Sequence, residues 1–244
     1  MKEMKTLTVN GITYAVTDPT AARIDDSVIG DAPWSAKKIV DTLCPAFTAT
    51  GNPVVCTPVE GYPLEVTSDS TVKRCGKNLF DFTQRPYQVT YVNASGSSYP
   101  RWGFAIYLPA GTYTLHAEEI TPSKNEYFLY GTVMNADGTY QEGCALRSGP
   151  NNHTRTVTLA SGDSILLYDG NGGLLQQAID LFAKFNIQCE TGTTATAYAP
   201  YRGETFAPGE VVPALAGVNT LWAESGQITV TGRALPWGGA ADGI

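Results

Sequence analysis

The sequence predicts a mainly β protein: an N-terminal β-hairpin plus a short helix, then a jelly-roll-like β-sandwich, then a C-terminal hairpin. Two observations predict this class. The 244 residues are rich in glycine (25), proline (15) and tyrosine (13), whereas charged residues make up only 16%. Branched and aromatic side chains fit a pleated surface, which glycine and proline interrupt. Short runs of such residues recur between turn signals, which is typical of β-sandwiches.

Residues 1–47 are expected to form a docking or oligomerisation module. The strongest local signal is Asn10-Gly11 in the middle of an alternating segment, because a type I′ hairpin turn needs positive φ at both central residues. A short helix is expected from Trp34 to Leu43, where apolar residues recur at helical spacing. Pro45 ends this helix, since the residue before a proline avoids the helical region.

The apolar side of the expected helix predicts a contact surface. Its residues are Trp34, Ile39, Val40 and Leu43. A helix this short is marginal alone, so it packs either around a threefold axis in a homotrimer or against the hairpin of its own chain. The sequence leaves both alternatives open.

Residues 48–75 are interpreted as a β connector, with short strands at 54–59 and 64–67 that its prolines place at sheet edges. Residues 76–203 are interpreted as the sandwich. Its expected strands are 88–92, 102–108, 112–118, 127–134, 153–159, 164–168 and 181–188. Residues 172–179 form either a short helix or a long loop. Residues 204–244 are expected to hold a linker, a hairpin of residues 220–223 and 227–231, and a tail.

Composition excludes several classes of function. The net charge is −7 and no basic run is present, whereas binding to nucleic acid or to an anionic membrane surface needs a cluster of Lys and Arg. The five cysteines form no CxxC pair, so neither a zinc site nor a disulfide framework is expected. Without an apolar signal segment or an apolar run of membrane length, the protein is expected to be made in a cytoplasm and to insert into no membrane.

The sequence predicts neither an enzyme nor a metal or other cofactor. Only His116 and His153 are available, and no Gly-x-Ser-x-Gly elbow accompanies them. The adjacent Glu118 and Glu119 point to opposite faces of a strand and so cannot clasp one glycosidic bond. Oxygen-rich segments at 137–139 and 169–172 are better explained as turns than as calcium sites.

A glycan site is the sharper hypothesis for the sandwich. Sugar sites combine an exposed aromatic ring with amide and carboxylate hydrogen-bonding groups. The candidates with this chemistry are Trp102, Tyr127, Tyr130, Tyr168, Asp169 and Asn171, supplemented by Tyr140, Asn135 and Asp137. The alternative is that these aromatic residues belong to the core.

Several blocks of the chain resemble minor structural proteins of phages that infect Gram-positive gut bacteria. Residues 76–80 (GKNLF) resemble the opening of a β-sandwich module in those proteins, and residues 108–115 (LPAGTYTL) its strand pair. Residues 190–201 (ETGTTATAYAPY) are similar to its closing segment, and residues 219–231 (NTLWAESGQITVT) to the ending of the same group. The opening hairpin and residues 34–45 (WSAKKIVDTLCP) resemble the head of such proteins.

The resemblance implies a virion structural protein, a tail, baseplate or fibre component, with a carbohydrate-binding-module-like sandwich. Its expected partners are further copies of itself, as a homotrimer, other virion proteins, and a glycan of the host cell surface. It would be made in the host cytoplasm and reside in the virion. A head fibre or decoration protein of the capsid is an alternative. A standalone lectin and a hydrolase of cell-wall polysaccharide are alternatives of another class.

Overall fold

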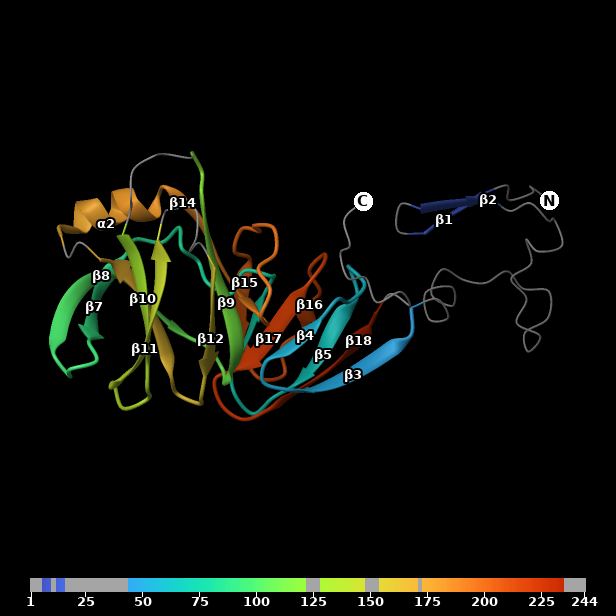
Figure 1. The fold of residues 1–244 in the computed structure, drawn as a ribbon. Coiled ribbons are helices and arrows are strands. Elements are labelled where there is room, and N and C mark those ends of the chain that lie inside the picture. Colours follow the sequence, from blue (N-terminus) through green and yellow to red (C-terminus); the bar gives the residue numbers. More distant parts are fainter. Residues whose placement is uncertain are drawn as a thin grey trace, which may run out of the picture.

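The computed structural model describes residues 6–9, 12–15, 44–121, 128–147, 154–170 and 173–234. Within these ranges the chain is mainly β, with one short helix and antiparallel pairing throughout. Two β units lie side by side (Figure 1). We call residues 76–202 the central β unit, and residues 46–75 together with 203–234 the flanking β unit. No helix in the described ranges has the length and apolar character needed to cross a membrane.

The central β unit has two sheets. The five-stranded sheet has the order β11-β10-β13-β8-β7, with β7 Tyr87–Val92, β8 Ser98–Tyr107, β10 Phe128–Met134, β11 Tyr140–Arg147 and β13 Ser164–Asp169. The three-stranded sheet has the order β12-β9-β14, with β9 Gly111–Glu119, β12 Thr154–Leu159 and β14 Phe185–Thr191. Both sheets contribute to one buried core, which includes Phe104, Ile165, Leu115 and Ile187. Burial of these apolar faces holds the sheets together.

The predicted strand at 181–188 is wrong in its first residues, because residues 175–182 form a helix. The expected strand at 181–188 begins only at Phe185, because α2 occupies Leu175–Phe182. The helix buries Ala178, Leu181 and Phe182, which recur at the helical spacing that lines one face. Phe182 packs edge-on against Phe104 at 4.9 Å between ring centroids. The open choice between helix and loop near residues 172–179 is thereby decided in favour of a helix.

The other expected strands of the central unit are present, within a few residues of their predicted ends. Strand β11 was not predicted. Its sequence, YQEGCALR, contains a glycine and two charged residues and shows no clear alternation, so its strand character comes from pairing with β10 along its whole length.

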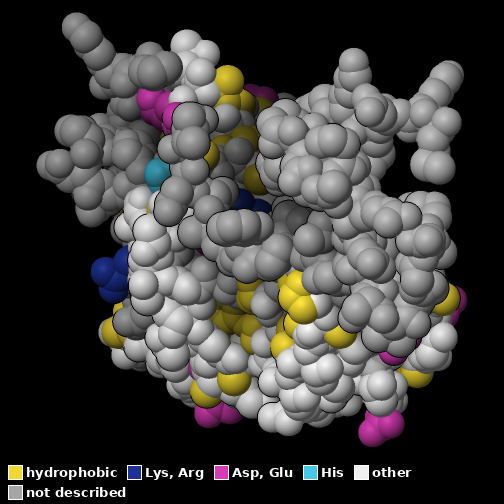
Figure 2. All heavy atoms as spheres, turned by 90° about the vertical axis from the view of Figure 1, so that its right-hand side faces the viewer, with side chains coloured by type: hydrophobic (Ala, Val, Ile, Leu, Met, Phe, Trp, Pro, Cys, Tyr) yellow, Lys and Arg dark blue, Asp and Glu magenta, His cyan; other side chains and the backbone are white. Residues whose placement is uncertain are grey.

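The flanking β unit also has two sheets. One has the order β15-β6-β17-β4, with β4 Val54–Cys56, β6 Val72–Cys75, β15 Gly203–Phe206 and β17 Asn219–Ala223. The other has the order β16-β5-β18-β3, with β3 Ala46–Gly51, β5 Pro63–Thr67, β16 Val212–Pro213 and β18 Ile228–Arg233. They share a core that includes Val54, Leu64, Leu221 and Val230. Figure 2, which faces this end of the molecule, shows hydrophobic side chains near its middle.

The predicted C-terminal hairpin is wrong. Strands β17 and β18 do not pair with each other: β17 pairs with β4 and β6, and β18 pairs with β3 and β5. The chain crosses from one sheet to the other between Ala223 and Ile228. Asn52 holds this crossing, since its amide nitrogen donates to the carbonyl oxygens of Ala223 (3.0 Å) and Gly226 (2.9 Å).

Residues 48–75 supply much of the flanking unit's sheets, although the sequence suggested a connector. Every strand from β3 to β6 pairs with a strand that follows the central unit in sequence. As its prolines predicted, β4 lies at a sheet edge, but β5 lies between β16 and β18.

The N-terminal hairpin prediction is confirmed at the level of the backbone. Strand β1 (Thr6–Val9) pairs antiparallel with β2 (Ile12–Ala15), and Val9 is opposite Ile12. The expected helix, with Trp34, Ile39, Val40 and Leu43, lies outside the described residues, as does the C-terminal tail.

Candidate binding face

Four tyrosines stand on the outer face of the five-stranded sheet: Tyr91 on β7, Tyr99 on β8, Tyr168 on β13 and Tyr130 on β10. We call these four residues the tyrosine row. Side chains alternate between the two faces of a strand. On β13, Ile165 and Leu167 enter the core between the sheets. Leu166 and Tyr168, which alternate with these two residues along the strand, belong to a separate apolar cluster on the other face. That cluster also contains Val89, Met134, Tyr91 and Tyr130.

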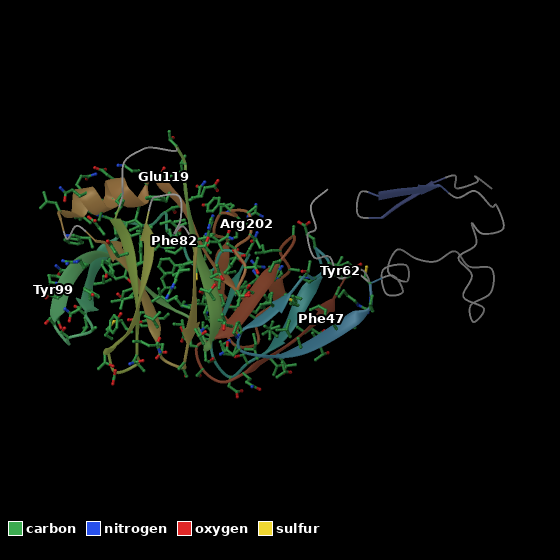
Figure 3. All side chains as sticks on the ribbon, viewed as in Figure 1. Phe47, Tyr62, Phe82, Tyr99, Glu119 and Arg202 are labelled. Carbon is green, nitrogen blue, oxygen red and sulfur yellow. The ribbon has the colours of Figure 1, made fainter. Side chains whose placement is uncertain are left out.

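The rings of the tyrosine row form one continuous stack, with Tyr99 and Tyr130 at its ends. Tyr99 and Tyr91 have ring centroids 6.1 Å apart, Tyr91 and Tyr168 5.1 Å, and Tyr168 and Tyr130 6.4 Å. The interplanar angles are 26°, 29° and 21°. Figure 3 places Tyr99 at the end of the central unit farthest from the flanking unit.

This stacking determines which ring faces are open. Tyr168 has a neighbouring ring on each side and is only 6% exposed, so no sugar ring can stack on it. Tyr99, at one end of the row, is 41% exposed. The row therefore offers the exposed part of the Tyr99 ring for contact with a ligand, while the inner residue Tyr168 offers only its edge and hydroxyl.

The hydroxyl of Tyr168 remains protonated at neutral pH. Burial raises the pKa of Tyr168 to about 12, because the apolar surroundings disfavour the phenolate. Its oxygen lies 3.4 Å from the Thr132 hydroxyl. Within the fold, this hydroxyl is therefore a protonated group whose neighbour is Thr132.

Arg101 extends the row with a positive charge. Its guanidinium carbon lies 5.6 Å from the centroid of the Tyr99 ring, a cation–π geometry. One guanidinium nitrogen donates to the carbonyl of Pro100 (3.2 Å). On β8, Arg101 is two residues from Tyr99 and opposite Val89 of the outer cluster, so it shares the face of the row.

The structure brings together only two of the six predicted glycan residues, Tyr130 and Tyr168. Trp102 is half-buried and packs against the core between the sheets. Asp169 is buried, and strand alternation turns it away from the face of Tyr168. Tyr127 and Asn171 lie outside the described residues.

Three residues of the face were missed: Tyr91, Tyr99 and Arg101. A signal for the two tyrosines was present. Both lie on strands that flank the glycine turn at Gly96. In the hairpin closed by this turn, Tyr91 is directly opposite Tyr99. Their stacking with Tyr168 and Tyr130 had no such signal, because it depends on the order of strands in the sheet.

The turn interpretation of the oxygen-rich segment near Asp137 agrees with its hydrogen bonds. The Asp137 carboxylate accepts from the amide (2.9 Å) and hydroxyl (2.6 Å) of Thr139, and these bonds lower the pKa of Asp137. Among the described residues no group of three His, Cys, Asp or Glu side chains is placed to hold a metal ion.

The motif at residues 76–80 has a structural role. The Asn78 amide donates to the carbonyl of Ile187 (3.0 Å) and its oxygen accepts from the amide of Cys189 (3.1 Å). Lys77 donates to the carbonyl of Ala197 (2.8 Å). These bonds connect the first residues of the central unit to β14 and to the segment around Ala197, near the end of the unit.

The motif at residues 190–201 is also structural. The buried Glu190 carboxylate accepts from the amide (2.9 Å) and hydroxyl (2.6 Å) of Thr196 and from the Gln188 amide (2.7 Å). In residues 108–115, the Tyr113 hydroxyl donates to the carbonyl of Pro109 (2.7 Å). The motifs that carry the resemblance thus stabilise loops and do not build the tyrosine row.

A hollow of about 530 Å³, which we call the junction hollow, lies where the two β units meet. Exposed Tyr107 and nearly buried Trp222 line it, together with Asn52 and Asp163. Asn52 and Asp163 are occupied with backbone hydrogen bonds to Ala223 and Ala160. These two side chains of the hollow are therefore used within the fold.

No family model matches the chain, and neither a curated protein nor a solved structure matches it. The assignment of function therefore depends on the motifs and the geometry of this chain.

Proposed function

We propose that this protein is a non-catalytic structural component of a phage particle, in the tail, baseplate or a fibre, and that it binds a glycan of the host surface. In this proposal the central unit is a jelly-roll-like sandwich and the tyrosine row is its binding face. The observation that carries the proposal is the row itself: four stacked tyrosines on an outer sheet face, ending in the exposed ring of Tyr99.

Tyrosine suits this role for physical reasons. Its ring presents an apolar surface to the C–H face of a sugar, and its hydroxyl forms hydrogen bonds with sugar hydroxyls. A tyrosine has few rotatable bonds, so little conformational entropy is lost on binding. Stacking between Tyr91 and Tyr130 already holds Tyr168 in place, which lowers that cost further.

The virion part of the proposal is supported by the motif resemblance, which runs through several blocks of the chain in the expected order. We propose that residues 1–47 dock the protein to other virion proteins, with a homotrimer as the expected assembly. Strands β7 and β8, which carry Tyr91 and Tyr99, lie at the end of the central unit farthest from the flanking unit (Figure 1).

The binding test uses the full chain and purified surface polysaccharides of Gram-positive bacteria, with affinity measured by calorimetry. Tyr99→Ala removes the exposed ring and is expected to weaken binding about tenfold or more, as for a central contact residue. Tyr107→Ala is the matched control, since Tyr107 is 69% exposed on the same strand but lies in the junction hollow. Equal affinity of both variants would contradict the proposal that the tyrosine row is the binding face.

The location test uses antibodies raised against the full chain. Labelling of purified phage particles in electron micrographs is expected at the tail, baseplate or fibres. Labelling confined to the capsid would support a head fibre or decoration protein instead, and unlabelled particles would contradict the virion assignment. Release of reducing sugar from the bound polysaccharide would contradict the non-catalytic assignment.

A further inference from the structure

We propose that the glycan bound by the tyrosine row is anionic and that Arg101 binds its phosphate or carboxylate groups. This inference rests on the proposed glycan-binding function and adds the chemical class of the ligand. It comes from the charge and the hydrogen-bonding groups of the face.

The guanidinium of Arg101 lies beside the only strongly exposed ring of the row. Its position over Tyr99, 5.6 Å from the ring centroid, keeps the charge next to the exposed part of that ring. A sugar that contacts Tyr99 therefore brings its substituents within reach of this cation.

No carboxylate neutralises Arg101 among the residues that the structure describes. A guanidinium has five N–H donors, and the hydrogen bond of Arg101 to Pro100 uses one nitrogen of the group. By contrast, buried Arg74 is bound to the Glu204 carboxylate at 2.5 Å and to the Pro213 carbonyl. In a chain of net charge −7, a cation without a counter-ion on a candidate binding face favours an anionic ligand.

The other polar groups of the face also favour an anion. Tyrosine hydroxyls are protonated at neutral pH and can donate hydrogen bonds, and the exposed residue Tyr99 brings one to this face. The carboxylate that the sequence suggested for binding sugar hydroxyls, Asp169, lies on the other side of the sheet. Hydrogen bonds from a guanidinium to a carboxylate or phosphate are shorter and stronger than those between neutral groups.

The test compares charged polymers with their neutral counterparts, using the full chain. The probes are a phosphate-bearing wall polysaccharide, the same polysaccharide after removal of phosphate, polygalacturonate, and polygalacturonate with its carboxyl groups reduced. We expect at least about tenfold tighter binding to one charged polymer than to its neutral form. The two pairs distinguish phosphate from carboxylate as the recognised group. Affinity should fall from about 0.1 M to about 1 M salt, as the Debye length shortens from about 10 Å to about 3 Å.

Arg101→Gln should remove both the preference for the charged polymer and most of the salt dependence, while leaving the thermal stability of the protein unchanged. Arg101→Lys keeps the charge and should retain part of the preference. Arg155→Gln is the control, because Arg155 is an exposed arginine on β12, in the other sheet.

The outcomes separate the two proposals. Equal binding of charged and neutral polymers, weakened by Tyr99→Ala but not by Arg101→Gln, would overturn the anionic ligand and leave glycan binding intact. If none of the four polymers binds, both proposals fail. A preference for charged polymer that survives Arg101→Gln would overturn the role of Arg101.

Discussion

Cys75 and Gly203 are opposite each other on the neighbouring antiparallel strands β6 and β15, although residues 76–202 separate them in the sequence. The amide of Gly76 donates to the carbonyl of Arg202 (2.8 Å) directly beyond this pair. The central β unit is thus inserted between two strands that pair with each other, and its two ends leave the flanking unit side by side. Insertions whose ends lie close together are readily accommodated by a host domain.

The insertion predicts that the flanking unit folds without the central unit. Replacing residues 76–202 with Asn-Gly, a pair suited to a tight hairpin turn, should leave a β protein that melts cooperatively, because strands β3 to β6 and β15 to β18 pair only among themselves. Its stability should be lower than that of the full chain, since Trp222 and Cys75 lose their contacts with the core of the central unit. Circular dichroism during a thermal melt is the measurement. A disordered spectrum at low temperature would contradict the prediction.

Gly103 is predicted to tolerate no larger side chain. A Cβ atom there would lie 2.0 Å from the carbonyl oxygen of Leu167 and 2.7 Å from the Cα of Tyr168. Both are backbone atoms of the adjacent strand, so the clash cannot be relieved by a side-chain rotation. Gly103→Ala should lower the free energy of unfolding by at least about 2 kcal/mol, measured by urea denaturation.

Gly76→Ala is the control for this substitution, because the nearest atom to a Cβ at Gly76 is 3.9 Å away. It should change the free energy of unfolding by less than about 0.5 kcal/mol. If the two substitutions lower the free energy of unfolding equally, the close packing of β8 against β13 is not the cause of the loss at Gly103.

Glu190 is predicted to hold residues 192–199 on the central unit. Glu190→Ala leaves the amide of Thr196 without its acceptor and removes the 2.7 Å hydrogen bond from the Gln188 side chain, which should cost about 1–3 kcal/mol of stability. Hydrogen exchange at the Thr196 amide should become faster than in the unmodified chain. Glu118→Ala, at an exposed position of β9, serves as the control. Unchanged exchange at Thr196 in the Glu190 variant would contradict this role.

Stability is predicted to fall in alkali. Burial raises the pKa of Cys56 and of Cys75 from 9.0 to about 11, and that of Tyr168 from 10.0 to about 12. The unfolded chain therefore releases these protons at lower pH than the folded chain does. The free energy of unfolding should be at its full value below pH 9 and should decrease as the pH rises toward 11 and 12.

Urea denaturation at neutral pH, at pH 9 and at pH 11 measures this effect, because the range from pH 9 to pH 11 extends from the ordinary pKa of a thiol, 9.0, to the raised pKa of about 11. Cys75→Ala should reduce the difference in the free energy of unfolding between pH 9 and pH 11, since one of the groups with a raised pKa is removed. Stability that is constant across this range in the unmodified chain would refute the linkage.

The sequence by itself determined most of the local structure. Alternating residues and turn signals located most strands of the central unit, and Asn10-Gly11 located the hairpin of β1 and β2. These predictions hold because propensity and turn geometry act over a few residues. Strand β11 was not predicted, because its mixed sequence has little β propensity of its own.

Only the tertiary structure decided which strands pair and which faces meet. Strands β17 and β18 follow each other directly, yet each completes a different sheet with strands from before the central unit. The tyrosine row has the same origin: Tyr91, Tyr168 and Tyr130 stack because β7, β13 and β10 belong to one sheet. Burying apolar faces selects among many possible pairings of distant strands. That selection depends on the whole chain, so no local pattern could show it.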